Sequence, residues 1–100
     1  MHKFYHMMLE APGLDPTGTE VENALNQFDN WIRYSQNCWI IYTDRDASYL
    51  YGKLGSLARS AKGGHIFIVC LDIKNRQGWM PKSLWNWLRE NQSASTPIIK

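Results

Sequence analysis

Two apolar runs constrain the fold of this chain more than any other feature of its sequence. The first run covers residues 38–43 (CWIIYT) and the second covers residues 65–71 (HIFIVCL). Both are rich in β-branched and aromatic residues, and a helical pattern lies between them, which predicts strand, helix and strand. A strand with one face in water alternates apolar and polar residues, whereas both faces of these runs are apolar. We therefore expect strands that are covered on both sides, with a second copy of the chain covering the face that the first two helices leave bare.

The other predicted elements complete a βαββαβ order. We expect a strand over residues 3–9, a helix whose capping box is Thr17 and Glu20, and a short strand over residues 31–34. The second helix has an apolar stripe at Ala47, Leu50, Leu54, Leu57 and Ala61. This order predicts an α+β, ferredoxin-like antiparallel sheet with strand order 4-1-3-2. An additional C-terminal helix runs from Pro81 to about Asn91, so residues 1–91 form one domain and residues 92–100 form a flexible tail.

Composition argues for one folded domain and against a membrane-spanning or secreted protein. The hydrophobic fraction of 44% in 100 residues is enough for one folded domain. No apolar run approaches the roughly 20 residues that a membrane-spanning helix needs, so we expect no membrane partner. The first residues do not resemble a secretory signal, because His2, Lys3 and His6 interrupt a short strand-like stretch. We therefore read Cys38 and Cys70 as small core residues of a protein in the reducing cytoplasm.

Charge is distributed unevenly along the chain. Residues 1–50 hold three basic and seven acidic residues, a net charge of −4, whereas residues 51–100 hold eight basic and two acidic residues, a net charge of +6. Basic residues interleaved with aromatic rings can bind phosphates and stack on bases, and the alternative is an ordinary solvated helix face above a core of aromatics. The predicted binding residues for a nucleic acid or another partner are Lys53, Arg59, Lys62, Lys74, Arg76, Lys82, Arg89 and Trp79.

One pair of residues has the chemistry of an acid–base or metal site. In the predicted topology the end of the first strand meets the start of the last, so Glu10 lies near His65. A carboxylate and an imidazole can act as catalytic acid and base, or bind a divalent metal across a dimer axis. Asp72 is a second candidate metal ligand, at the opposite end of the last strand, near His2. The alternative is that all of these are ordinary surface residues.

Residues 30–88 resemble a known family. The pattern consists of an aromatic residue at Trp31, a hairpin with Ser35 followed by Trp39-Ile40, a helix over 47–57, an apolar strand over 65–71 and Gly78-Trp79-x-Pro81. It resembles the small SinR-like proteins, which are related in fold to VapD-type toxins and to the CRISPR-associated endoribonuclease of the spacer-acquisition complex. The resemblance implies a ferredoxin-like homodimer of prokaryotic or phage origin, in which dimer formation covers the second face of the sheet. In the CRISPR-associated relatives a metal-binding Asp ends the first strand, and Glu10 stands at that position here, which implies Mg²⁺ if the chain is a nuclease.

Three functional hypotheses follow from the sequence. The first is a non-catalytic dimeric binding protein without a cofactor, whose basic C-terminal surface contacts RNA, DNA or an acidic protein. The second is a metal-dependent ribonuclease that uses Glu10 with His65 or Asp72. The third is a phage- or mobile-element-encoded inhibitor that docks onto a host enzyme or defence complex through an edge strand or an aromatic surface.

Overall fold

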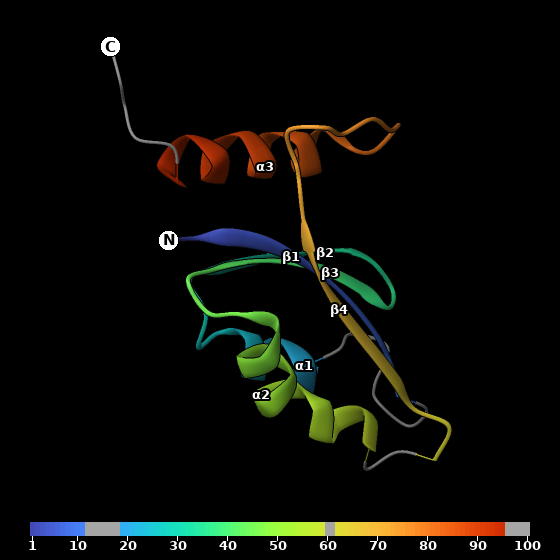
Figure 1. Ribbon diagram of the computed structural model, residues 1–100. Helices are drawn as coiled ribbons and strands as arrows, with labels where there is room; N and C mark the ends of the chain where they lie inside the picture. Colours follow the sequence, from blue (N-terminus) through green and yellow to red (C-terminus); the bar gives the residue numbers. More distant parts are fainter. Residues whose placement is uncertain (12–18, 60–61, 96–100) are drawn as a thin grey trace.

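The protein has two helical layers around one four-stranded sheet (Figure 1). The computed structural model describes residues 1–11, 19–59 and 62–95. The strands form an antiparallel sheet in the order β2-β3-β1-β4, and the predicted α+β class with an antiparallel sheet and three helices is confirmed. The elements are β1 (Lys3–Glu10), α1 (Thr19–Leu25), β2 (Asn30–Ser35), β3 (Cys38–Thr43), α2 (Ala47–Arg59), β4 (His65–Leu71) and α3 (Lys82–Ser95).

The main core lies between the sheet and the layer of α1 and α2. Side chains alternate along a strand, so Tyr5, Met7 and Leu9 of β1 point to this side, together with Trp39 and Ile41 of β3. The helices contribute apolar stripes at three- and four-residue spacing, as the sequence predicted. The buried helical residues of this layer are Val21, Leu25, Leu50, Leu54 and Ala58.

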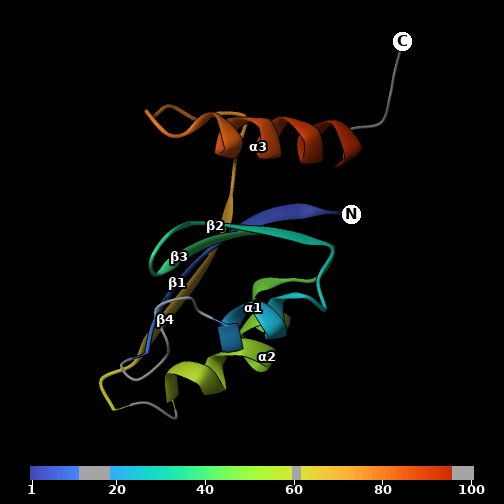
Figure 2. The same ribbon diagram turned by 180° about the vertical axis from the view of Figure 1, so that it is seen from behind.

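The second face of the sheet is covered in part by α3, which lies across the end of the sheet where the N-terminus is (Figure 2). Leu84 and Leu88 of α3 pack on Phe4, Ile40 and Tyr42, which explains why β1 and β3 are apolar on both faces. The expectation that a second copy must cover this face is therefore wrong at this end, because the chain's own C-terminal helix lies there.

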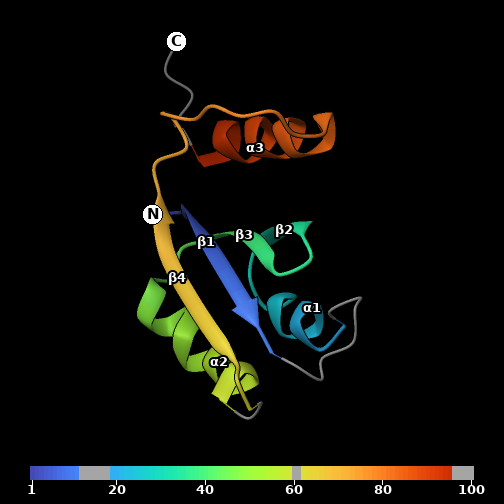
Figure 3. The same ribbon diagram turned by 90° about the vertical axis from the view of Figure 1, so that its right-hand side faces the viewer.

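The strand β4 is less buried than its composition predicted. It lies at the edge of the sheet, and its exposed residues include Phe67, Val69 and Cys70 (Figure 3). The prediction that this strand is covered on both sides is wrong, since α3 does not reach along its length. Cys70 is accordingly not a core residue, and Cys38 is half-buried.

Element boundaries differ from the prediction at two places. The first helix ends at Leu25, before the predicted end near Asp29, and the last helix continues to Ser95, so the first four residues of the predicted tail are helical. Thr17 of the predicted capping box, Ala61 of the second helix and residues 96–100 of the tail lie outside the described residues.

Candidate functional site

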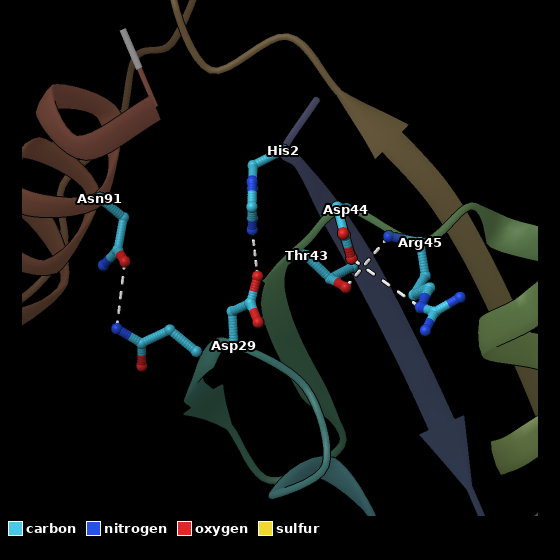
Figure 4. A network of polar contacts seen from close by, with 7 residues as sticks. His2, Asp29, Thr43, Asp44, Arg45 and Asn91 are labelled. Atoms are coloured by element: carbon cyan, nitrogen blue, oxygen red, sulfur yellow. Dashed lines mark hydrogen bonds and ion pairs between the residues drawn. The ribbon is translucent and has the colours of Figure 1, made fainter.

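Three metal-ligating side chains meet at the end of the sheet where β1 and β2 begin and β3 ends (Figure 4). His2 directly precedes β1, Asp29 directly precedes β2, and Asp44 directly follows β3. Antiparallel pairing of β1 with β3 and of β3 with β2 brings these three chain positions to one edge. One ligand atom from each side chain lies within 4.8 Å of the others.

Neighbouring residues hold this cluster in place. The His2 ring stacks on the Tyr42 ring with centroids 4.9 Å apart and an interplanar angle of 23°, and His2 Nε2 contacts an oxygen of Asp29. In the turn after β3, the backbone N–H of Arg45 donates to Thr43 Oγ1 at 3.1 Å, and the Thr43 side chain is buried. The turn that carries Asp44 is therefore anchored in the sheet.

The donor set of this cluster suits a divalent cation. An imidazole nitrogen favours zinc, iron or nickel, whereas carboxylate oxygens also suit magnesium and manganese. All three side chains are exposed, so an ion would keep water molecules in its remaining positions. Without a metal, the same geometry serves as an ion pair between His2 and Asp29.

A polar cavity of about 250 Å³ connects this cluster to the start of α2. Both carboxylates, Asp29 and Asp44, line it, and so do Thr43, Arg45 and Tyr49. The cavity therefore places a candidate cation site beside an arginine and a phenol, which are groups that bind phosphate oxygens.

The solvent side of α2 carries two clusters of cations on aromatic rings. Arg45 Cζ and Lys53 Nζ lie 4.6 and 5.5 Å from the centroid of the Tyr49 ring, and Arg59 Cζ lies 5.0 Å from that of Tyr51. No acidic residue occurs between residues 47 and 59. The α2 cationic face, as we call Arg45, Tyr49, Tyr51, Lys53 and Arg59, therefore gathers cations and rings on α2 and on the turn before it, where Arg45 Nε lies 3.8 Å from Asp44 Oδ1.

Small residues lie between the two clusters of this face. Ser48, Gly52 and Ser56 are all exposed and recur at a spacing of four residues, which places them on one side of the helix. A side chain added at Gly52 would meet no atom within 4 Å. The middle of the α2 cationic face is therefore open to a ligand.

The structure brings Glu10 and His65 together, as the topology predicted. They are partners in the β1–β4 ladder, and His65 Nδ1 lies 3.7 Å from Glu10 Oε1. Asp72 lies beyond the other end of β4, seven residues of strand or roughly 24 Å away, so it cannot share an ion with Glu10 within one chain. The Asp72 carboxylate accepts a hydrogen bond from the backbone N–H of Lys74 at 3.1 Å. The Glu10–His65 pair supplies two exposed ligands in one chain, and a Mg²⁺ ion held there would take its other ligands from water or from a second copy of the chain.

The predicted basic residues do not share one surface. Lys53 and Arg59 belong to α2, whereas Lys82 and Arg89 belong to α3, and these helices lie on opposite faces of the sheet (Figure 1). Arg76 is held by hydrogen bonds from Nη1 to the carbonyl of Ile73 and to Gln92 Oε1, both at 3.0 Å. The other predicted residues, all exposed, lie in the turn before β4 or in the segment after it, and they are Lys62, Lys74 and Trp79.

His2, Asp29 and Asp44 as a group, and Arg45 as a binding residue, were not among the site residues predicted from the sequence. The signal was present in the predicted topology, because order 4-1-3-2 places the starts of the first and second strands beside the end of the third. The prediction placed His2 at this end of the sheet, near Asp72, but did not add Asp29 and Asp44, which flank the second and third strands there.

Comparisons with known proteins give no relative for this arrangement. No protein family, curated protein or solved structure matches the chain. Among the described residues, no helix has the length and apolar character required to cross a bilayer.

Proposed function

We propose that this protein is a dimeric, non-catalytic nucleic-acid-binding protein that holds a phosphate backbone on the α2 cationic face. The observation that carries the proposal is the pair of cations on the Tyr49 ring, with Lys53 from α2 and Arg45 from the turn before it, beside a helix that has no acidic residue between 47 and 59. Lysine and arginine side chains neutralise backbone phosphates and release counterions, which favours binding of nucleic acid. Tyr51, which is 46% exposed beside Arg59, supplies a ring on which a base can stack.

The fold is consistent with the family resemblance seen in the sequence. Taken from the β4 edge, the strand order is β4-β1-β3-β2, and we propose that the chain has the ferredoxin-like fold and is related to the SinR-like proteins. Both cysteines are free thiols, in keeping with the proposed cytoplasmic location.

The test uses substitutions at Gly52, in the middle of the α2 cationic face. Gly52→Glu adds a negative charge there, Gly52→Gln adds the same volume without charge, and Gly52→Lys adds a positive charge. Each of the three is a better helix former than glycine by about 0.5–1 kcal/mol, so lost binding cannot be attributed to unfolding of α2. We expect a labelled single-stranded RNA to bind most tightly to the Lys variant and most weakly to the Glu variant, with the Gln variant between them.

The salt dependence of binding completes this experiment. Binding of wild-type protein should weaken as salt rises, since phosphate contacts release counterions, and the slope should decrease in Arg45→Gln. Absence of RNA and DNA binding at low salt would refute the proposal. Binding to an acidic polypeptide but not to an oligonucleotide would show instead that the partner is a protein.

A metal-dependent ribonuclease is the second candidate, favoured by the cluster of His2, Asp29 and Asp44 beside Arg45. A metal at these residues would polarise a phosphate or activate a water molecule, and Arg45 would bind the phosphate oxygens. We expect Mn²⁺ to raise the thermal midpoint of wild-type protein but not that of Asp29→Asn. Cleavage of RNA with Mg²⁺ or Mn²⁺ that Asp29→Asn abolishes would replace the non-catalytic proposal, whereas cleavage that only Glu10→Gln abolishes would place the site at the other end of the sheet.

A further inference from the structure

The edge strand β4 lacks the features that normally prevent an edge from pairing. Its seven residues, HIFIVCL, include no proline, lysine, arginine or acid, and β1 occupies only one of its two sides. Apolar side chains remain exposed along it, with Phe67 at 59% and Val69 at 38%. An edge of this kind leaves a row of backbone N–H and C=O groups beside an apolar surface.

The opposite edge, β2, is protected in the usual ways. A register shift interrupts its ladder between Arg33 and Ser35. Arg33 stands in this strand, lies 3.9 Å from Glu22 and donates to the carbonyl of Gln36. The absence of such features from β4 therefore distinguishes one edge from the other within the same sheet.

We infer that β4 pairs antiparallel with β4 of a second copy, centred on Phe67, to form a continuous eight-stranded sheet. In this register Phe67 lies opposite Phe67 of the second copy, and Ile66 lies opposite Ile68. Phe67, Val69 and His65 then share the side of the sheet that α3 leaves open, and Ile66 and Ile68 share the side of α2. Phe67 and the two isoleucines therefore meet apolar side chains, and Val69 lies opposite His65. The inference specifies the dimer of the proposed function and rests on that part of it.

The charges at the two ends of β4 favour the same antiparallel arrangement. Lys62 lies in the turn before the strand and Asp72 directly follows it. The two-fold axis brings each Lys62 to the end of the partner strand that carries Asp72, whereas parallel pairing would bring like charges together. Asp72 is oriented for this contact by its hydrogen bond from the backbone N–H of Lys74. Shape and charge at this edge therefore both match a second copy of the chain.

The first test is the mass in solution. We expect wild-type protein to show twice the chain mass of 11.7 kDa by light scattering or sedimentation, and a monomer at all concentrations would overturn the inference. Phe67→Lys places two ammonium groups opposite each other and should give the single-chain mass, while Phe67→Leu should remain dimeric. Trp79→Lys is the matched control, because it exchanges a 99% exposed aromatic residue away from β4 and should leave the mass at the dimer value. Loss of the dimer in Trp79→Lys but not in Phe67→Lys would assign the interface elsewhere.

A cross-linking experiment tests the register. In a background with Cys38→Ser and Cys70→Ser, Phe67→Cys should form an interchain disulfide, because directly opposite residues have Cα atoms within the bonding range of about 4.4–6.8 Å. Val69→Cys should not, since the two copies of residue 69 are offset by four residues, or about 13 Å. Cross-linking through Val69→Cys alone would overturn the proposed centre.

RNA binding separates this inference from the proposed function. The α2 cationic face belongs to a single chain, so monomeric Phe67→Lys should still bind single-stranded RNA at low salt. Any decrease in affinity should come from having one binding face instead of the two faces of a dimer. A wild-type dimer that binds no RNA would refute the nucleic-acid proposal alone, and a wild-type monomer that binds RNA would refute the β4 dimer alone.

Discussion

The two helical layers cover the sheet to different extents. Under α1 and α2, eleven buried residues form one continuous cluster, and several of them, including Met7, Ile41, Leu50 and Leu54, have no exposed surface. Under α3, six buried residues form the cluster, and each keeps a small exposed fraction. The first layer spans the sheet, whereas the second covers one end of it. The difference shows that two neighbouring strands can be apolar on both faces without a partner chain over the whole second face.

A polar contact beside the candidate metal site links α3 to the sheet. Asn30 Nδ2, at the start of β2, donates to Asn91 Oδ1 of α3 at 3.0 Å, and Asn91 Nδ2 donates to the carbonyl of Trp87 at 2.8 Å (Figure 4). Asn91 is buried, so this pair fixes the position of α3 over the sheet as well as satisfying polar groups. The layer that covers less of the sheet is therefore placed by a specific polar contact in addition to apolar packing.

We expect the largest loss of stability from a substitution in the core under α1 and α2. Leu54 is 0% exposed between α2 and the sheet, so Leu54→Ala leaves a cavity that surrounding residues cannot fill. We expect the free energy of unfolding to fall by about 3–4 kcal/mol, measured by urea denaturation with a shift in midpoint and an unchanged slope.

We expect a smaller loss of stability from the corresponding substitution in the core under α3. Leu88 of α3 is 4% exposed and the α3 layer is open on one side, so its neighbours can move to reduce the cavity. Leu88→Ala should cost about 2 kcal/mol, and Leu88→Met less than about 1.5 kcal/mol. A loss for Leu88→Ala that equals or exceeds that for Leu54→Ala would contradict the comparison.

A single cap is expected to contribute less than either core residue. Asp46 Oδ1 accepts a hydrogen bond from the backbone N–H of Tyr49 at 2.8 Å, at the start of α2. Asp46→Ala should therefore lower the free energy of unfolding by about 1 kcal/mol, and Asp46→Asn should restore most of it because asparagine also caps helices. An equal loss in both variants would show that the charge matters and the hydrogen bond does not.

The sequence predicts where the strands occur better than it predicts how deeply each strand is buried. The strands at 38–43 and 65–71 occur at the predicted residues, because local composition and alternation decide whether a segment is extended. The predicted order 4-1-3-2 places β3 inside the sheet and β4 at its edge, as found, but the apolar composition of β4 predicted a burial that an edge strand does not have. Cys70 shows the consequence, because an apolar strand predicted it to be buried and an edge strand exposes it.

The candidate sites show the same limit. The pairing of Glu10 with His65 follows directly from the order of strands, and it is found. The predicted basic surface fails as a single surface, because a sum of charges over half a chain does not distinguish α2 from α3. Arg45 lies in the acidic half of the chain and yet contributes to the α2 cationic face, because the turn before α2 brings it to 4.6 Å from the Tyr49 ring. The charge of a single helix therefore predicts a shared basic surface better than the net charge of half the sequence does.

The smallest predicted effect is a pH dependence on the α3 side of the sheet. Burial lowers the pKa of His6 below its ordinary value of 6.5, and its Nε2 is hydrogen-bonded to the Tyr34 hydroxyl. The unfolded chain takes up a proton at His6 as the pH falls through about 6.5, whereas the folded chain resists protonation until a lower pH. The unfolded state thus binds more protons in this window, and the free energy of unfolding should decrease as the pH falls below 6.5.

Substitutions at this site separate burial from hydrogen bonding as the cause. His6→Phe removes the titrating group, so the difference between its stability and that of wild-type protein, followed by denaturation from neutral to mildly acidic pH, isolates the contribution of His6. Tyr34→Phe removes the hydroxyl but keeps the ring that helps to exclude water, and it should preserve the pH dependence, because burial is the cause of the lowered pKa. Loss of the dependence in Tyr34→Phe would show that the contact with the Tyr34 hydroxyl, and not burial, lowers the pKa of His6. Persistence of the full dependence in His6→Phe would assign it to a group other than His6.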